Sequence, residues 1–363
     1  MLMVIFGAGA SFDSCPTYRP FQRGPDGAPL FGPEVEGCRP PLAKDVFDNR
    51  EMFVDTLEDF YQCKTIVGRL RHPAVLSGAV SIEKCLGVIR EEAKTYPRGA
   101  QELAAVRCYL QRAIWRCEER WRYVTKGITN QLALLREIER NSAPDESVCL
   151  VTFNYDRLLE DALGLLGSRH AVDRMEDYAS RDRLFRLFKV HGSVNWGLEF
   201  DGGPNFWPGE PFRGSYDSLI VERTPPIHTP HIYVRSDPLT LCSVDGRFVF
   251  PAIAIPVEDK NEFQFPDSVF VALKELLPKV SRVVTIGWRA SEAHFLGLLD
   301  GHLRPGVRTF VVAGGRKDAE EVRTRILRGM PSSPPNCTAE DVYGFTDFVL
   351  SGLAGQIVSD CLA

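Results

Sequence analysis

Residues 4–11, Val-Ile-Phe-Gly-Ala-Gly-Ala-Ser, decide the fold that this chain is expected to adopt. Three apolar residues run directly into two glycines, Gly7 and Gly9, and Ser11 follows them. This order is typical of a buried strand that ends in a turn where the backbone can approach a phosphate closely. The stretch therefore predicts the first strand of an α/β sheet, with a ligand site at the end of the strand.

The turn departs from the usual dinucleotide fingerprint, Gly-x-Gly-x-x-Gly, because Phe12 stands where the third glycine would be. Its side chain would obstruct the close packing of helix on strand that a glycine permits. Two interpretations stay open: the glycines only make a tight turn, or the loop holds a phosphate through backbone amides. The candidates for the phosphate contacts are Gly7, Ala8, Gly9 and Ser11.

Polar residues follow two later apolar runs in the same way. Asn154 comes directly after the run 148–153, and His191 comes after the run 184–190. An imidazole at such a position can act as a general base near neutral pH, so we expect Asn154 and His191 to form a catalytic pair. The alternative for His191 is a structural histidine bonded to a backbone carbonyl. Asp156 is expected to cap the helix that begins after it, since Asp suits helix N-termini.

Apolar strands alternate with helices through much of the chain, which predicts a parallel sheet covered on both faces. Ligands bind to such sheets beyond the carboxyl ends of the strands. Five candidate positions fall at that edge, namely Gly7, Asn154, His191, Gly287 and Gly314. Their convergence on one edge is stronger evidence for a site than any of the motifs alone.

The pattern predicts a single domain over residues 1–363, with a Rossmann-like core in residues 1–13 and 146–330. Residues 44–140 carry apolar side chains at three-to-four spacing and are expected to form a large helical insertion. Residues 331–363 are expected to form a helical tail.

The segment 14–43 is rich in Pro and Gly. Long irregular segments in compact enzymes are often functional covers. Because this one directly follows the glycine turn, we expect it to cover the ligand.

The composition excludes several classes of protein. The chain has 363 residues, 44% of them hydrophobic, which is enough for a sizeable core. Its net charge of −5 argues against a general electrostatic grip on nucleic acid, so no sequence-specific nucleic-acid contact is expected. No signal-peptide pattern and no apolar run long enough for a bilayer are found, so a cytoplasmic protein without a membrane contact is predicted.

The ten cysteines are scattered and form no Cys-x-x-Cys pair. This usage is typical of a reduced protein with buried thiols, and it leaves no zinc ribbon. His228 and His231 flank Pro230, which disfavours the helix that would bring both onto one face. We therefore predict no metal site.

Four motifs together resemble the sirtuin-type NAD-binding fold. Residues 7–11 are similar to the opening loop of that superfamily, and Thr-Phe-Asn-Tyr-Asp at 152–156 is similar to its Thr-Gln-Asn-Ile-Asp element. His191-Gly192 resembles its catalytic His-Gly, and Thr-Ile-Gly-Trp at 285–288 resembles its late Gly-Thr-Ser turn. The resemblance covers the sheet core, about half of the chain, and leaves out the helical insertion and the tail.

The departures point to one branch of that superfamily. The cysteine-rich zinc module is missing, Tyr155 stands where Ile is usual, and the insertion is helical. A divergent bacterial branch shares these features, and its members hydrolyse NAD+ as effectors of anti-phage defence. The resemblance therefore implies NAD+ as substrate, and a protein partner such as a hexameric translocase ATPase or an Argonaute-like protein. A homo-oligomer is also expected, because amphipathic helices outside the core commonly pack on other chains.

The resemblance implies an NAD+ glycohydrolase with Asn154 and His191 as catalytic residues. The residues expected to bind the dinucleotide are Gly7, Ala8, Gly9, Ser11, Asp156, Gly192, Gly287, Trp288 and Gly314. Two alternatives stay open, an NAD-dependent protein deacylase that lacks zinc and a silent module that senses NAD+ or ADP-ribose.

Overall fold

The computed structural model describes the chain except residues 21, 23–29, 78, 97, 144, 201–231, 235–247, 257–262 and 363. His228 and His231, considered above as metal ligands, lie outside the described residues. So do most of the residues between 201 and 247.

A six-stranded sheet forms the centre of the molecule, and every strand pair in it is parallel. The strand order is β3-β2-β1-β7-β8-β9. The bounds are β1 (Leu2–Phe6), β2 (Val148–Thr152), β3 (Phe185–Lys189), β7 (Arg282–Ile286), β8 (Arg308–Val312) and β9 (Asn336–Ala339). Counted within this sheet, the order is 3-2-1-4-5-6, which is the order of dinucleotide-binding Rossmann sheets. The predicted α/β fold is confirmed, and the strand order reverses between β1 and β7.

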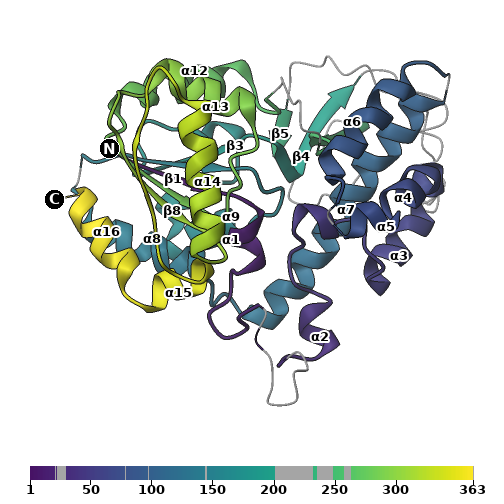
Figure 1. The fold of residues 1–363 in the computed structure, drawn as a ribbon, viewed down its shortest axis with the longest axis horizontal. Coiled ribbons are helices and arrows are strands. Elements are labelled where there is room, and N and C mark those ends of the chain that lie inside the picture. The colour runs from purple at the N-terminus through teal and green to yellow at the C-terminus, as the bar shows by residue number, and fades with distance from the viewer. Residues whose placement is uncertain are drawn as a thin grey trace.

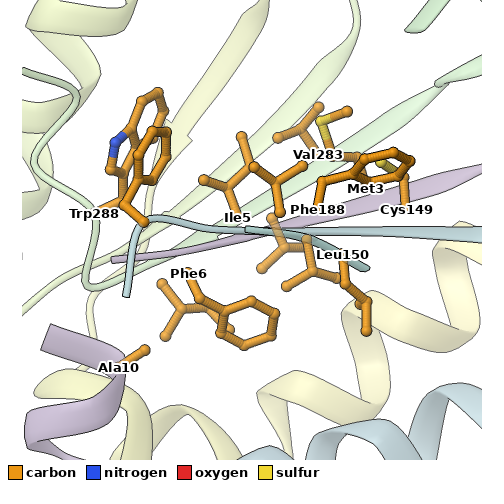
Figure 2. Packing of buried hydrophobic residues seen from close by; sticks show 14 of the residues in the cluster. Met3, Ile5, Phe6, Ala10, Cys149, Leu150, Phe188, Val283 and Trp288 are labelled. Carbon is orange, nitrogen blue, oxygen red and sulfur yellow. The ribbon is translucent and has the colours of Figure 1, made fainter. Parts of the chain in front are cut away.

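The central strands are apolar because both faces of the sheet are covered. Figure 2 shows Met3, Ile5 and Val283 on one side of β1, and Phe6 and Leu150 on the other. All five side chains are buried. The register follows from this two-sided burial, since a shift would leave these side chains unpacked.

Helices cover both faces of the sheet. Figure 1 shows α12 and α13 on one face, and α8, α15 and α16 on the other. The helices around the sheet are α1 (Ala8–Phe12), α8 (Asn130–Asn141), α9 (Leu158–Leu166), α10 (Met175–Tyr178), α12 (Asp267–Leu276), α13 (Ala293–His302), α14 (Arg316–Gly329), α15 (Gly344–Leu350) and α16 (Leu353–Leu362). Among the described residues, no helix combines the length and apolar character needed to cross a membrane.

The inserted helices build a second lobe with a hydrophobic core of its own (Figure 1). Its helices are α3 (Glu51–Asp59), α4 (Lys64–Leu70), α5 (Pro73–Leu76), α6 (Ile82–Ala93) and α7 (Gly99–Thr125). A three-stranded antiparallel sheet, order β5-β4-β6, adjoins it. The bounds are β4 (Gly192–Phe200), β5 (Ile232–Val234) and β6 (Phe248–Ile253). Phe250 and Ile253 of β6 complete the core of the lobe.

Three boundaries differ from the sequence-based expectation. The expected helical tail contains β9, an edge strand whose residues lack the apolar run of a buried strand. The last helix of the expected insertion, α8, packs on the main sheet, because Leu132, Leu135 and Ile138 join the central core. A strand was expected over residues 248–256, where β6 lies, but β4 was missed because it begins with Gly192 and carries polar residues inward.

The described part of the segment 14–43 is held against α7. Arg39 is 1% exposed, and its guanidinium donates to the carbonyls of Phe12 and Tyr18 and to the carboxylate of Glu36. The segment includes the short helix α2 (Pro33–Glu36). The Trp121 indole N–H donates to Ser14 Oγ at 2.8 Å. These contacts anchor both ends of the segment, and its role as a cover stays a prediction.

Candidate active site

The site is built on loops that follow neighbouring strands of the parallel sheet. From β3 across to β8, the residues that follow the strand ends are His191, Asn154, Gly7, Gly287 and Gly314. All five therefore lie at the carboxyl edge, as the pattern predicts. The reversal of strand order places the loops after β1 and β7 side by side at its centre.

These two central loops touch through their backbones. The N–H of Gly7 donates to Ile286 O at 3.0 Å, and the N–H of Gly9 donates to Gly287 O at 3.1 Å. A Cβ on Gly7 would lie 2.5 Å from both Gly287 O and the Cα of Trp288. Gly287 has φ +60°, and a Cβ there would lie 2.4 Å from the N of Ala10. The tight-turn interpretation thus describes these glycines, and the amides of Gly7 and Gly9 are used inside the protein. A role of this turn in holding a phosphate stays a prediction.

Asn154 is bound to the glycine turn by its amide group. Its Nδ2 donates to Gly7 O at 2.9 Å and to Ser11 Oγ at 2.8 Å. Both N–H groups are thereby occupied, so the carbonyl oxygen Oδ1 is the atom that this half-buried side chain can offer to a ligand. The catalytic candidate and the glycine turn, 147 positions apart in sequence, form one unit.

Ser11 and Asp156 extend the hydrogen bonds of Asn154. Burial raises the pKa of Asp156, while the nearby Lys189, a hydrogen bond from Ser11 and the N–H of Leu158 lower it. Asp156 Oδ1 accepts from the N–H of Leu158, the first residue of α9, at 3.2 Å, although the N-cap position itself is Arg157. The Asp156 carboxylate therefore accepts hydrogen bonds from Leu158 and Ser11 within the protein. Its contact with the dinucleotide stays a prediction.

His191 lies where the main sheet passes into the small one. It is 5% exposed, and its carbonyl accepts from the N–H of Ala254 at 2.9 Å. The imidazole contacts the Phe153 ring edge to face, with centroids 5.1 Å apart. Gly192 has φ +81°, and a Cβ there would lie 1.9 Å from Ala252 O, so only glycine fits after the histidine.

An aromatic cluster fills the space beside His191. Phe153 and Trp288 stack with centroids 5.4 Å apart and an interplanar angle of 1°, and Phe295 meets both rings edge to face. Trp288 is 3% exposed, and its indole N–H donates to Glu292 Oε2 at 2.6 Å. The predicted binding residue Trp288 therefore packs its ring into the core in this structure (Figure 2).

Gly314 is at the same edge but farther from the pair. It follows β8, beyond Gly287 as seen from Asn154, and it is exposed. A Cβ on Gly314 would meet only the far end of Asp318, at 3.0 Å. Packing therefore does not require a glycine there.

Sequence reasoning missed a link between the inserted lobe and this site. Glu118 of α7 is buried and accepts from the backbone N–H of Arg157 at 2.9 Å and from its Nε at 2.8 Å. Arg157 directly follows Asp156, so an inserted helix holds the loop that carries Asn154. Burial outweighs the opposing charges of Arg157 and Arg122 and raises the pKa of Glu118 to about 7. The helical spacing of α7 could not reveal this contact, since Glu118 appears in sequence as one charge in a charged run.

A metal centre and one cavity were considered as further sites in the described ranges. No cluster of His, Cys, Asp and Glu suited to a metal ion occurs in these ranges. A cavity of about 290 Å³ lies between α10 and α12, lined by Met175, Val269 and Glu275 among others, and it includes none of the predicted site residues.

Sirtuin structures are among the solved structures that match this chain. No protein-family model matches the chain, and no curated protein matches it by sequence. A structure of Sir2Tm with a propionylated peptide has a TM-score of 0.38 and 11% identity, and covers 99% of this chain and 94% of that one. A structure of Sir2 with a p53 peptide and NAD+ has a TM-score of 0.36 and 13% identity, with the same coverage. The fold assignment above rests on the strand order itself.

Proposed function

We propose that this protein is an NAD+ hydrolase that cleaves the bond between nicotinamide and ribose and releases nicotinamide and ADP-ribose. One observation carries the proposal. Asn154 and His191 follow adjacent strands, and Asn154 is bonded to the turn at the point where the strand order reverses. Sheets of this order bind dinucleotides at that point.

The hydrolysis of an N-glycosidic bond needs a hydrogen-bond acceptor and a general base, and Asn154 and His191 can supply them. Breaking an N-glycosidic bond passes through an oxocarbenium-like ribose, which water then attacks. Asn154 Oδ1 can accept a hydrogen bond from a ribose hydroxyl or from that water. The His191 imidazole can take the proton that the water or the hydroxyl loses, and such positioned acid–base help contributes about 10²–10⁴ in rate. The exclusion of bulk water around a His191 that is 5% exposed strengthens these interactions.

The role in anti-phage defence is the second part of the proposal. It is supported by three features that resemble the divergent bacterial branch: Asn-Tyr-Asp at 154–156, the missing zinc module and the helical insertion. An effector of this kind acts with a partner, for which we propose a hexameric translocase ATPase or an Argonaute-like protein. The inserted lobe is the proposed contact, because it reaches the site through Glu118 and Arg157.

Incubation of the purified chain with NAD+ alone tests the proposal. Free nicotinamide without any acyl acceptor is expected. Nicotinamide that appears only with an acylated peptide would instead establish a deacylase, and tight binding without turnover would establish a sensor. Either of these results would refute the hydrolase.

Two substitutions extend the test to the residues. His191→Ala and Asn154→Ala should each abolish nicotinamide release. The matched controls are His302→Ala and Asn141→Ala, which make the same chemical changes at the ends of α13 and α8, away from the site. Melting temperatures measured in parallel show that each variant is folded. Near-native turnover in either site variant would remove that residue from the mechanism.

A further inference from the structure

The last residue of β3 is Lys189, which is not among the proposed catalytic or dinucleotide-binding residues. Lys189 is 0% exposed, although a buried ammonium group loses several kcal/mol of hydration. Its Nζ donates to the backbone carbonyl of Asp156 and to Glu160 Oε1, the latter at 2.9 Å. An apolar strand of the core thus ends in a fully buried cation, two positions before His191.

The two contacts of Lys189 reach the loop that carries Asn154. Asp156 belongs to residues 153–157, which connect β2 to α9, and Glu160 lies in the first turn of α9. Lys189 therefore joins the end of β3, which leads to His191, directly to the loop after β2.

A second layer of hydrogen bonds holds Glu160. The hydroxyl of Tyr178 donates to Glu160 Oε1 at 3.1 Å, and the indole N–H of Trp196 donates to the Tyr178 oxygen at 3.0 Å. Both aromatic side chains are buried. Buried hydrogen bonds thus fix Glu160, which fixes the Lys189 ammonium group in turn. The other hydrogen bond of Lys189 goes to the Asp156 carbonyl.

The charge of Lys189 also acts on the carboxylate of Asp156. It lowers the pKa of Asp156 against the larger effect of burial and so favours the ionised acceptor. Asp156 binds Ser11, and Ser11 Oγ accepts from Asn154 Nδ2 at 2.8 Å. A chain of contacts therefore runs from Lys189 to the amide that we assign to the substrate.

We propose that Lys189 is a positioning residue whose ammonium group holds the loop 153–157 so that Asn154 and His191 face one substrate. It touches neither the substrate nor the reacting atoms. The consequence for NAD+ cleavage rests on the proposed function, whereas the holding of the loop does not.

A purely structural ion pair would respond differently to mutation. Removing one member of a buried pair leaves an uncompensated charge, whereas replacing both by neutral groups of similar size is often harmless. Lys189→Met with Glu160→Gln makes such a replacement, and the glutamine can still accept from Tyr178. The double variant therefore separates stability from positioning.

The experiment compares Glu160→Gln, the double variant and the native chain. The double variant should melt later than Glu160→Gln and close to the native temperature, because it loses the bond to the Asp156 carbonyl but leaves no unpaired charge. Its kcat for nicotinamide release should nevertheless fall about 100-fold with little change in KM, because small misplacements of catalytic groups have effects of this size. Glu160→Gln keeps the bond from Lys189 to Asp156, so it should melt earlier and retain the native kcat at low temperature. The pair Arg183→Met with Asp177→Asn, at another ion pair of 2.6 Å, is the control and should retain the native kcat.

Hydrogen exchange in the free protein gives a readout without NAD+. Amide exchange in residues 153–157 should accelerate at least tenfold in the double variant and stay native in Glu160→Gln. Native exchange there in the double variant, or a kcat that follows the melting temperature across both variants, would overturn the proposal. If the native chain releases no nicotinamide, the proposed function fails and exchange alone decides the role of Lys189. If the double variant does not fold, Glu160→Gln decides it, since accelerated exchange or a reduced kcat there refutes positioning.

Discussion

Replacing Gly7 by alanine tests how closely the two central loops must approach. The backbone of Gly7, φ −107° and ψ −176°, suits alanine, so any loss of stability comes from contact alone. The new Cβ would lie 2.5 Å from Gly287 O and from the Cα of Trp288, whereas non-bonded carbon atoms prefer about 3.5–4.0 Å. The loop after β7 must therefore retreat by roughly 1 Å.

That retreat breaks defined interactions. The bonds from Gly7 to Ile286 O and from Gly9 to Gly287 O, at 3.0 and 3.1 Å, would stretch beyond hydrogen-bonding distance. Each contributes about 1 kcal/mol, and the strain of overpacking adds about 1–3 kcal/mol. We expect Gly7→Ala to lower the free energy of unfolding by about 3–5 kcal/mol, a large part of the 5–15 kcal/mol typical of a domain.

Urea unfolding followed by circular dichroism measures the change. Gly315→Ala is the matched control, since its backbone is extended and its Cβ would lie 3.8 Å from the Tyr343 ring, an ordinary contact. The control should lose less than about 1 kcal/mol. Equal stability of the two variants would show that the loops do not need this close approach.

Three further predictions concern charge, metal and assembly. Burial raises the pKa of Glu118 from 4.5 to about 7, so the folded chain holds a proton that the unfolded chain has lost in this window, and the contribution of Glu118 to stability falls as the pH rises through it. The melting temperature of the native chain should therefore fall relative to that of Glu118→Gln as the pH rises from 4.5 to 7, and the difference should stay constant above pH 7. A difference that does not depend on pH would contradict the assigned pKa shift. Elemental analysis should find no stoichiometric zinc, because the cysteines lack ligand spacing; one zinc per chain would refute this. Light scattering should report an oligomer whose activity changes when the partner is added, and a fully active monomer would argue against control by the inserted lobe.

The main sheet could be predicted because its strands are short, apolar and followed by glycine or polar residues. A strand that is buried on both faces has a nearly continuous apolar sequence, so each such strand can be identified from its own residues. The strands β9 and β4 escaped prediction because they lack this signature. β9 is half exposed at an edge, and β4 carries Ser193 and Asn195 on a buried face.

The sequence predicted where the candidate site lies in the fold, but it did not predict most of the contacts that its residues make. Asn154 and His191 could be placed together because the carboxyl ends of parallel strands meet at one edge, whatever the details of the loops. The roles of Gly7 and Trp288 could not be predicted, since each depends on a segment more than 100 positions away. The Gly7 N–H donates to the carbonyl of Ile286 at the end of β7, and the Trp288 ring stacks on Phe153.

The sequence by itself determined the class of fold and the edge at which a ligand would bind, because hydrophobic periodicity and strand-end residues act locally. Only the tertiary structure decided which polar groups remain available there. Asn154 keeps its carbonyl oxygen because Gly7 and Ser11 use its amide, and the loop is held by Lys189 and Glu118 from two different parts of the chain. A buried hydrogen bond needs both partners within about 3 Å, and only the folded chain brings such distant residues to that distance.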